Sequence, residues 1–267
     1  MLEGHVELER YNRELETAFL AARNAGKQII SQRTNSRAEK SGLELKTEVD
    51  NLADRTIKRV IAEAFPNDSI LTEESGFPQS PAERLWVVDP IDGTTNFING
   101  LRAYSTLIAF VDKGKLVIGV SFLPQSQEMF WAVDGEGAYK GNTKITVSQM
   151  ADIGKASIVL DPGYHPQGVE KISDAWGKLR PNVGNVGVLN ANGYTLSLIA
   201  NGELPALIHF YSKVWECAGL LLVTEAGGKV TNFKGHNVKL DFARNDGFEF
   251  VASNGLIHNA LLELLNK

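Results

Sequence analysis

The stretch Trp86-Val87-Val88-Asp89-Pro90-Ile91-Asp92-Gly93-Thr94-Thr95 places two carboxylates, a glycine and two hydroxyls directly after an apolar run. The apolar run up to Asp89 predicts a buried strand. Pro90 has no N–H to donate, so we expect it to end the hydrogen-bond ladder. Asp89 and Asp92 then converge from the strand end and the following turn. Two carboxylates held this close repel each other unless a cation lies between them or one keeps its proton.

Gly93 allows the backbone to approach a ligand closely, and free amides at this point suit an anion. Carboxylates for a hard cation beside amides for a phosphate indicate metal-assisted phosphoryl chemistry. These ten residues alone also fit a strand followed by an ordinary acidic turn, because Asp, Gly and Thr are common turn residues. The rest of the chain must decide between the two interpretations.

Composition predicts a soluble globular protein. The chain has 267 residues, of which 43% are hydrophobic and 22% charged, with a net charge of −5. The acidic balance argues against a protein whose main task is to hold nucleic acid. No apolar stretch reaches the roughly 20 residues that span a bilayer, and the first residues lack the pattern of a secretory signal. We therefore expect a cytoplasmic protein that needs neither a membrane nor nucleic acid.

Cys217 is the only cysteine, so no internal disulfide can form, which fits a reducing cytoplasm. A lone cysteine can be a nucleophile, but no base lies near it in sequence. We interpret Cys217 as a small residue of the core.

The first half of the chain, residues 1–148, reads as two helices followed by an antiparallel meander. We expect a helix over residues 8–33, a polar surface loop over 34–46, and a second helix over Asn51–Phe65 with Asp50 at or near its N-cap. Turn residues separate the three strands of the meander, which are Tyr104–Val111, Lys115–Phe122 and Glu128–Val133.

The second half, residues 149–267, alternates strands and helices. The expected strands are Ser157–Leu160, Ala206–Ile208 and Phe248–Ala252, and the expected helices are Val169–Leu179, residues 192–201, Trp215–Ala226 and Leu256–Leu265. The fold class is α/β (α+β), and we expect one compact unit with a cleft where the two halves meet.

Carboxylates lie at four element boundaries: Asp50, Glu73 with Glu74, Asp89 with Asp92, and Glu216. Each one alone is more typical of a surface acid or a helix cap. Their joint pattern resembles the inositol monophosphatase family, over most of the chain from Lys46 to Gly228. Trp86 to Thr95 matches the first signature of that family almost letter for letter, and Thr72-Glu73-Glu74-Ser75 matches its acidic pair.

The resemblance implies a layered αβαβα sandwich of the inositol monophosphatase/fructose-1,6-bisphosphatase type and Mg²⁺-dependent hydrolysis of a small phosphate monoester by activated water. It also implies two or three Mg²⁺ ions, lithium sensitivity and a homodimer. The implied Mg²⁺ ligands are Glu73, Asp89, the carbonyl of Ile91, Asp92 and Glu216. Asp50 and Thr94 match the pair that orients the attacking water, beside the Mg²⁺ that Glu73 helps to hold. The amides near Gly93 and Thr94 match the phosphate cradle, which Asp92 adjoins.

Two positions need separate interpretation. Lys40 lies where the family often has a lysine near a third metal, although a solvated lysine is the alternative. Glu216 stands where the family normally has Asp, and its extra methylene changes how the carboxylate reaches a metal.

The substrate wall departs further from the family pattern. Residues 187–194 carry neither the usual Arg nor the usual Gly-Ser-Ala-Ala run. Asn192 lies in this run and is a candidate substrate contact. His209 falls where the animal enzymes have the acid that contacts the inositol ring, so it is a second candidate. A lone histidine is more often structural.

The sequence therefore predicts a phosphoric monoester hydrolase similar to inositol-1-phosphate phosphatases. Fructose 1,6-bisphosphate, 3′-phosphoadenosine 5′-phosphate and histidinol phosphate are alternative substrates, because relatives share the metal core. A regulatory or binding protein with weakened catalysis is the alternative from another class, motivated by Glu216 and the altered wall.

Overall fold

Strand β4 (Arg84–Asp92), which contains most of the signature stretch, lies second from the edge of a seven-stranded sheet. The computed structural model describes residues 10–32, 38–41, 44–78 and 83–267. The sheet order is β3-β4-β5-β6-β7-β8-β9, in which only β3 runs parallel to its neighbour. The other strands are β3 (Ser69–Thr72), β5 (Ser105–Asp112), β6 (Lys115–Leu123), β7 (Glu128–Val133), β8 (Gly137–Lys140) and β9 (Thr143–Ile145).

A second, five-stranded sheet has the order β11-β10-β12-β14-β13. Its central strand β12 runs parallel to β10 and antiparallel to β14. The strands are β10 (Ser157–Asp161), β11 (Asn185–Val188), β12 (Ala206–Ser212), β13 (Lys229–Thr231) and β14 (Phe248–Ser253). Every strand of the first sheet precedes residue 149, and every strand of the second follows it.

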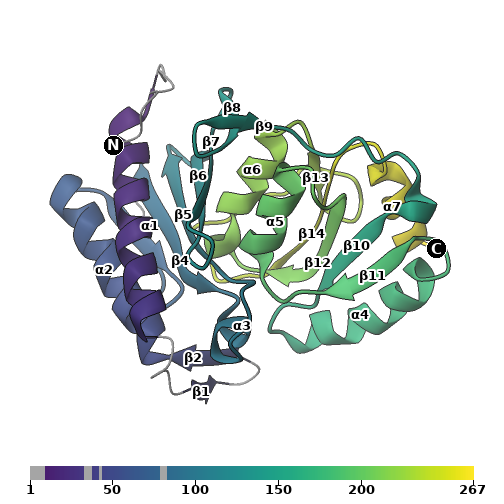
Figure 1. Ribbon diagram of the computed structural model, residues 1–267, viewed down its shortest axis with the longest axis horizontal. Coiled ribbons are helices and arrows are strands. Elements are labelled where there is room, and N and C mark those ends of the chain that lie inside the picture. Colours follow the sequence, from purple (N-terminus) through teal and green to yellow (C-terminus); the bar gives the residue numbers. More distant parts are fainter. Residues whose placement is uncertain (1–9, 33–37, 42–43, 79–82) are drawn as a thin grey trace.

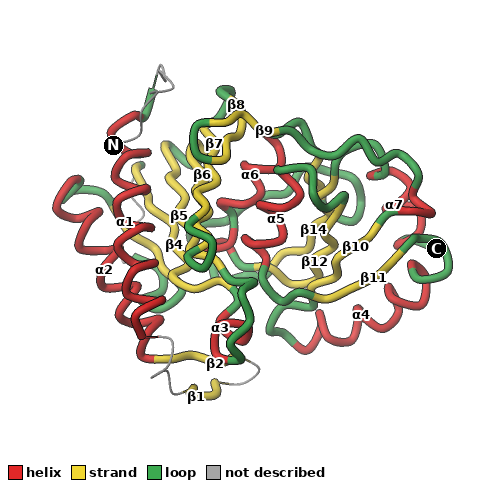
Figure 2. Tube along the Cα trace, in the orientation of Figure 1, coloured by secondary structure: helices red, strands yellow, loops and turns green. Residues whose placement is uncertain are grey.

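Helices cover both sheets and separate them (Figure 1). Helices α1 and α2 pack on the outer face of the seven-stranded sheet, α5 and α6 lie between the sheets, and α4 and α7 cover the far face of the second sheet. Figure 2 shows the resulting alternation of helical and strand layers, which is the expected αβαβα sandwich. The α-helices are α1 (Asn12–Gln32), α2 (Glu48–Ala64), α3 (Thr94–Ile98), α4 (Pro166–Leu179), α5 (Asn192–Ala200), α6 (Ala218–Glu225) and α7 (His258–Leu265), and the 3₁₀ helices are η2 (Ile153–Lys155) and η3 (Val214–Glu216).

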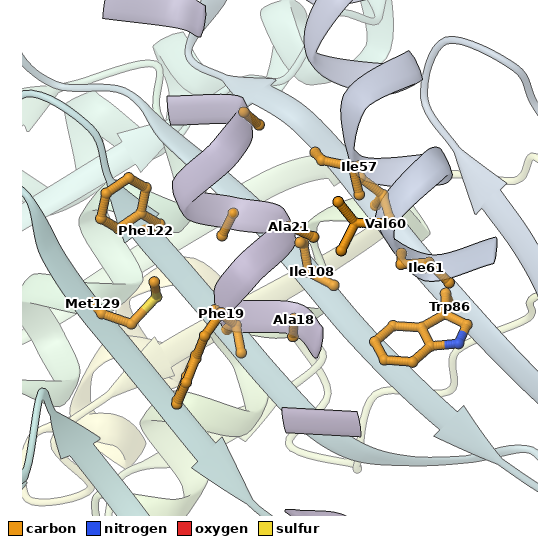
Figure 3. Close-up of a cluster of buried hydrophobic side chains, with 14 of the residues drawn as sticks. Ala18, Phe19, Ala21, Ile57, Val60, Ile61, Trp86, Ile108, Phe122 and Met129 are labelled. Carbon is orange, nitrogen blue, oxygen red and sulfur yellow. The ribbon is translucent and has the colours of Figure 1, made fainter. Parts of the chain in front are cut away.

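The largest part of the core lies between the first two helices and the seven-stranded sheet. Small residues such as Ala18 and Ala21 let α1 lie close to the sheet, while Ile57 and Ile61 of α2 reach toward Trp86 of β4 (Figure 3). All five side chains are fully buried. Burial of apolar surface on this scale fixes β4, and with it the carboxylates that the strand carries.

The described part of residues 34–46 is not a loop. An antiparallel hairpin forms there from β1 (Ala38–Ser41) and β2 (Glu44–Thr47), while residues 33–37 and 42–43 lie outside the described residues. The prediction was wrong because these polar strands carry no alternating apolar face. The strands β8, β9, β11 and β13 were also not predicted, since each has only three or four residues.

Candidate active site

A bulge in β4 brings the two signature aspartates together. The pairing of β4 with β5 shifts between Asp89 and Asp92, so the strand continues past Pro90 as far as Asp92. The expectation that Pro90 ends the ladder was therefore wrong. The bulge absorbs the missing N–H, and the Pro90 carbonyl accepts a hydrogen bond from Thr106 Oγ1 at 2.9 Å.

Gly93 follows the bulge with φ = +85°, in the left-handed region that favours glycine. A Cβ atom at this position would lie 2.9 Å from the Cβ of Ala191, so the space is closed as well. Helix α3 begins at the next residue, Thr94. The first amides of a helix have no partner within the helix, and Gly93 and Thr94 line the same cavity as the aspartates.

Asp92 ties the first sheet to helix α5. Its Oδ1 accepts the Asn192 backbone N–H at 2.8 Å, and its Oδ2 accepts the Gly193 N–H at 2.9 Å and the Ser105 hydroxyl at 2.8 Å. A carboxylate at a helix N-terminus is stabilised by these amides. Burial raises the pKa of Asp92 to about 7, with Glu216 contributing by charge repulsion.

Asp50 lies inside helix α2 and is not its N-cap. Thr47 caps the helix, and Asp50, three residues on, accepts the Thr47 backbone N–H at 2.8 Å in a reciprocal capping box. The other oxygen, Oδ1, accepts the Thr94 hydroxyl at 3.1 Å. Thr94 Oγ1 is also 2.8 Å from the Ile91 carbonyl oxygen, and its single proton serves one of the two acceptors at a time. Burial raises the pKa of Asp50.

Glu73 follows β3 and meets Asp89 of the neighbouring strand. The Glu73 N–H donates to the Val88 carbonyl at 3.1 Å, which holds the chain beside β4. The Glu73 and Asp89 carboxyl groups are neighbours, and a hydrogen bond between them requires a proton on one of the two. Burial raises the pKa of Glu73 to about 8 and also raises that of Asp89, whose neighbours Glu73, Asp92 and Glu216 repel its charge. These acids and Thr94 form one side of the site, which we call the floor. Without a cation, the floor therefore favours protonated carboxyl groups.

Glu216 ends the 3₁₀ helix η3 and presents one oxygen to a set of donors. Its Oε2 accepts the Ser212 hydroxyl at 2.5 Å, the Asn192 Nδ2 at 3.0 Å and the Lys213 backbone N–H at 3.1 Å. These contacts hold the longer side chain in one orientation. All three of these contacts fall on Oε2.

The donor set fits a divalent cation that prefers hard oxygen ligands. Oxygen atoms of Asp89, Asp92 and Glu216 lie within 4.8 Å of one another. Asp89 Oδ1 is buried and has no hydrogen-bond partner in the part of the chain that the structure describes. An orphaned buried carboxylate oxygen is costly unless a cation neutralises it. Oxygen ligands of this kind suit Mg²⁺.

A cavity of about 180 Å³ opens above these acids and is lined by both halves of the chain. The expected residues Glu73, Asp89, Ile91, Asp92, Gly93, Thr94, Asn192 and Glu216 all line it. Asp50 lies behind Thr94. Sequence reasoning did not find the other lining residues, which include Asp161, Tyr164, His165, Tyr211 and Lys213. Asp161 had a usable signal, because it ends a buried strand just as Asp89 does.

His209 does not line the cavity, although spacing placed it at the substrate wall. It lies on β12, is 1% exposed, and its Nε2 is 3.7 Å from both Asp161 Oδ1 and Glu216 Oε2. The ring therefore lies behind the wall, between Asp161 and Glu216, which both line the cavity. The reason is that Asp161, on the adjacent parallel strand, occupies the front.

The sequence also singled out Lys40 and Cys217, of which Cys217 lies outside the lining of the cavity. Lys40 lies in β1, and its side chain falls outside the described residues. Cys217 is fully buried, which confirms the core interpretation, and burial raises the pKa of its thiol. Among the described helices, none is long and apolar enough to cross a membrane.

Comparisons with known proteins identify the family of the chain. The sequence model of the inositol monophosphatase family matches residues 11–267. The chain belongs to the inositol monophosphatase family. It is 31% identical over 241 residues to a fructose-1,6-bisphosphatase/inositol-1-monophosphatase of Thermotoga maritima, covering 88% of each chain. It is 34% identical over 238 residues to the Nus factor SuhB of Pseudomonas aeruginosa, covering 85% of this chain and 88% of the relative.

The fold is also shared. The solved structure of a Thermotoga maritima IMPase superposes with a TM-score of 0.86 at 28% identity, covering 95% of this chain and 96% of that one. The chain is thus a member of a family of phosphatases at about 30% identity to these relatives, a distance that leaves room for the changes seen at Glu216 and the substrate wall.

Proposed function

We propose that this protein hydrolyses a small phosphate monoester in a Mg²⁺-dependent reaction with water as the nucleophile, and that inositol 1-phosphate is the first substrate to test. The observation that carries the proposal is the convergence of Glu73, Asp89, Asp92 and Glu216 on one cavity. Membership of the inositol monophosphatase family supports the same chemistry.

Glu73, Asp89 and the Ile91 carbonyl would hold one Mg²⁺, and Asp89, Asp92 and Glu216 a second. When bound, the ions acidify water and neutralise charge on the attacking and leaving oxygens. Phosphate monoesters hydrolyse extremely slowly unaided, so stabilisation of charge has to lower most of the barrier. Asp92 has a second task, because the same carboxylate fixes the start of helix α5 and so sets the distance between the floor and the wall.

The hydroxyl of Thr94 and the carboxylate of Asp50 form the proton route. When Thr94 Oγ1 donates to Asp50 Oδ1, its lone pairs are free to accept a proton from water on the cavity side. Burial favours proton uptake by Asp50, since it raises the pKa of that carboxyl. Thr47 holds the other oxygen and keeps the acceptor in place.

The amides at Gly93 and Thr94 would bind the phosphate. They follow the bulge directly, and the left-handed conformation of Gly93 turns the chain so that helix α3 starts at the cavity. Backbone donors of this kind need no side chain. A side chain at position 93 would also be strained, because its Cβ would lie 2.9 Å from that of Ala191.

The direct test is phosphate release from inositol 1-phosphate and from p-nitrophenyl phosphate, with Mg²⁺ and with a chelator. We expect turnover only with Mg²⁺, and a loss on the order of a thousandfold in kcat for Asp89→Asn, which removes a ligand shared by both ions. Asp174→Asn is the matched control, because its side chain is 69% exposed on helix α4.

Absence of turnover on any monoester by folded, Mg²⁺-loaded protein would instead favour a binding or regulatory role. The panel should include fructose 1,6-bisphosphate, histidinol phosphate and 3′-phosphoadenosine 5′-phosphate. A cavity of about 180 Å³ favours a leaving group the size of one small ring over a nucleotide. A homodimer, a cytoplasmic location and lithium inhibition remain predictions, and lithium inhibition is read from the same assay.

A further inference from the structure

The end of strand β10 carries an acid that the proposed hydrolysis does not use. Asp161 is 7% exposed and lines the same cavity as the aspartates of β4. Its Oδ1 accepts the Gly163 backbone N–H at 2.9 Å, which fixes the carboxylate. An aspartate offers four acceptor positions, so one hydrogen bond leaves acceptor capacity toward the cavity.

His209 lies behind Asp161 and helps to hold its carboxylate at the cavity. The parallel register of β10 and β12 places the two residues directly beside each other. His209 Nδ1 accepts the Tyr211 backbone N–H at 3.2 Å, so the proton of the neutral ring lies on Nε2. That Nε2 is 3.7 Å from an oxygen of Asp161 and 3.7 Å from an oxygen of Glu216. The donor therefore faces both carboxylates and lies between them.

The same wall holds a buried acceptor with no donor, on Asn192. Asn192 is 1% exposed and lines the cavity, and its Oδ1 has no hydrogen-bond partner within the described ranges. Its Nδ2 is engaged by Glu216 at 3.0 Å. A nearby donor is engaged as well, since Lys213 Nζ donates to Asn245 Oδ1 at 3.0 Å.

The buried Asn192 Oδ1, which has no donor, and the remaining acceptor positions of Asp161 are left for a ligand to satisfy. We propose that Asp161 recognises the leaving group of the substrate by accepting hydrogen bonds from it. The wall thereby selects a small monophosphate with a hydroxyl or ammonium donor near the ester. The inference rests on the proposed phosphatase function and names its substrate class. His209 is a positioning residue that acts through Asp161.

Three matched substrates test the inference: 2-hydroxyethyl phosphate, O-phosphoethanolamine and n-propyl phosphate. They differ only in a terminal hydroxyl, ammonium or methyl group. We expect the wild-type protein to prefer one of the two donor-bearing esters over the propyl ester by tenfold or more in kcat/KM, because buried acceptors reject a ligand that leaves them unpaired. Which of the two is preferred tells a polyol from an amino-alcohol substrate.

In Asp161→Asn we expect this preference to fall at least fivefold, mainly through KM for the donor-bearing ester. His209→Leu should lower it as well, and His209→Gln, which keeps a donor near the Nε2 position, should restore most of it. Asp174→Asn should behave as the wild type. If Asp161→Asn does not fold, the wild-type ranking of the three esters still tests the wall.

Equal kcat/KM for all three esters, or an unchanged preference in folded Asp161→Asn, would overturn the inference. Mg²⁺-dependent hydrolysis of p-nitrophenyl phosphate distinguishes that outcome from failure of the proposed function. If even this ester is not hydrolysed, the phosphatase function fails and the inference fails with it.

Discussion

The floor and the wall of the cavity are built in different ways. Asp89, Asp92 and Thr94 of the floor lie within six consecutive positions, on a strand and turn fixed by buried neighbours. The wall is assembled from separate elements, with Asp161 on β10 and Asn192 on α5. Local sequence therefore sets the chemistry, while tertiary packing sets which leaving group fits.

After Asp89, the largest effect on the floor is expected at Thr94. Thr94→Val keeps the shape of the side chain but removes the hydroxyl that contacts Asp50 at 3.1 Å. We expect kcat to fall about a hundredfold, as for loss of a general acid–base group, with little change in KM. Steady-state kinetics at saturating Mg²⁺ measure this.

Thr94→Ser is the matched control, because it keeps the hydroxyl and should retain most of kcat. A similar loss in Thr94→Ser and Thr94→Val would mean that packing of the methyl group, and not proton transfer, explains the residue. Full activity of Thr94→Val would remove Thr94 from the floor's chemistry altogether.

Glu216 joins floor and wall, and a medium effect is expected there. Its Oε2 is held by Ser212, Asn192 and Lys213, so Glu216→Gln changes the charge presented to a cation while the size is kept. We expect the half-saturating Mg²⁺ concentration to rise about tenfold. Mg²⁺ titrations of the initial rate measure it.

Glu63→Gln is the control for that titration, because Glu63 lies on α2 with its side chain 72% exposed. Unchanged Mg²⁺ dependence in Glu216→Gln would refute the assignment of Glu216 as a ligand. The carboxylate would then belong to the wall alone, as a partner of His209.

The floor was readable from sequence because its residues are contiguous. Asp89, Asp92 and Gly93 indicate a ligand-binding turn from local sequence alone, without knowledge of the residues that pack around them. The role of Asp50 was less readable, because Thr47 three residues earlier is the better cap and leaves Asp50 free to contact Thr94. That contact joins residues 44 positions apart, which no local pattern encodes.

The wall could not be predicted for a related reason. Asp161 and His209 are adjacent only because β10 and β12 pair in parallel with this register. Spacing along the chain identified His209 as the counterpart of a family acid, but the register places Asp161 in front of it. Residues 38–47 escaped prediction differently, since polar strands in a hairpin lack the alternation that marks a half-buried sheet.

The smallest expected effect is on the free energy of unfolding. Buried titratable groups at the two sheets contribute to it with opposite pH dependence. In the metal-free protein, burial raises the pKa of Asp92 to about 7 and of Glu73 to about 8. Folding therefore takes up protons at the floor, and acidification from neutral pH stabilises that region.

His258 at the second sheet has the opposite sign. Its two ring nitrogens are 2.8 Å from the hydroxyls of Thr231 and Ser253, and burial lowers its pKa to about 4. Because the unfolded chain binds a proton near pH 6.5, the stability of neutral His258 is complete above that pH and is lost as the pH falls toward 4.

We expect the wild-type protein to lose about 1 kcal/mol more of its unfolding free energy than His258→Gln between pH 6.5 and 5.5. Urea unfolding of both proteins in chelator measures the difference, and His236→Gln, at an exposed site, is the control. Because the floor acids are identical in all three proteins, their contribution cancels and only the histidine remains. Equal pH dependence of wild type and His258→Gln would mean that the folded and unfolded proteins bind a proton at His258 equally, so that burial beside Thr231 and Ser253 does not lower the pKa of the ring.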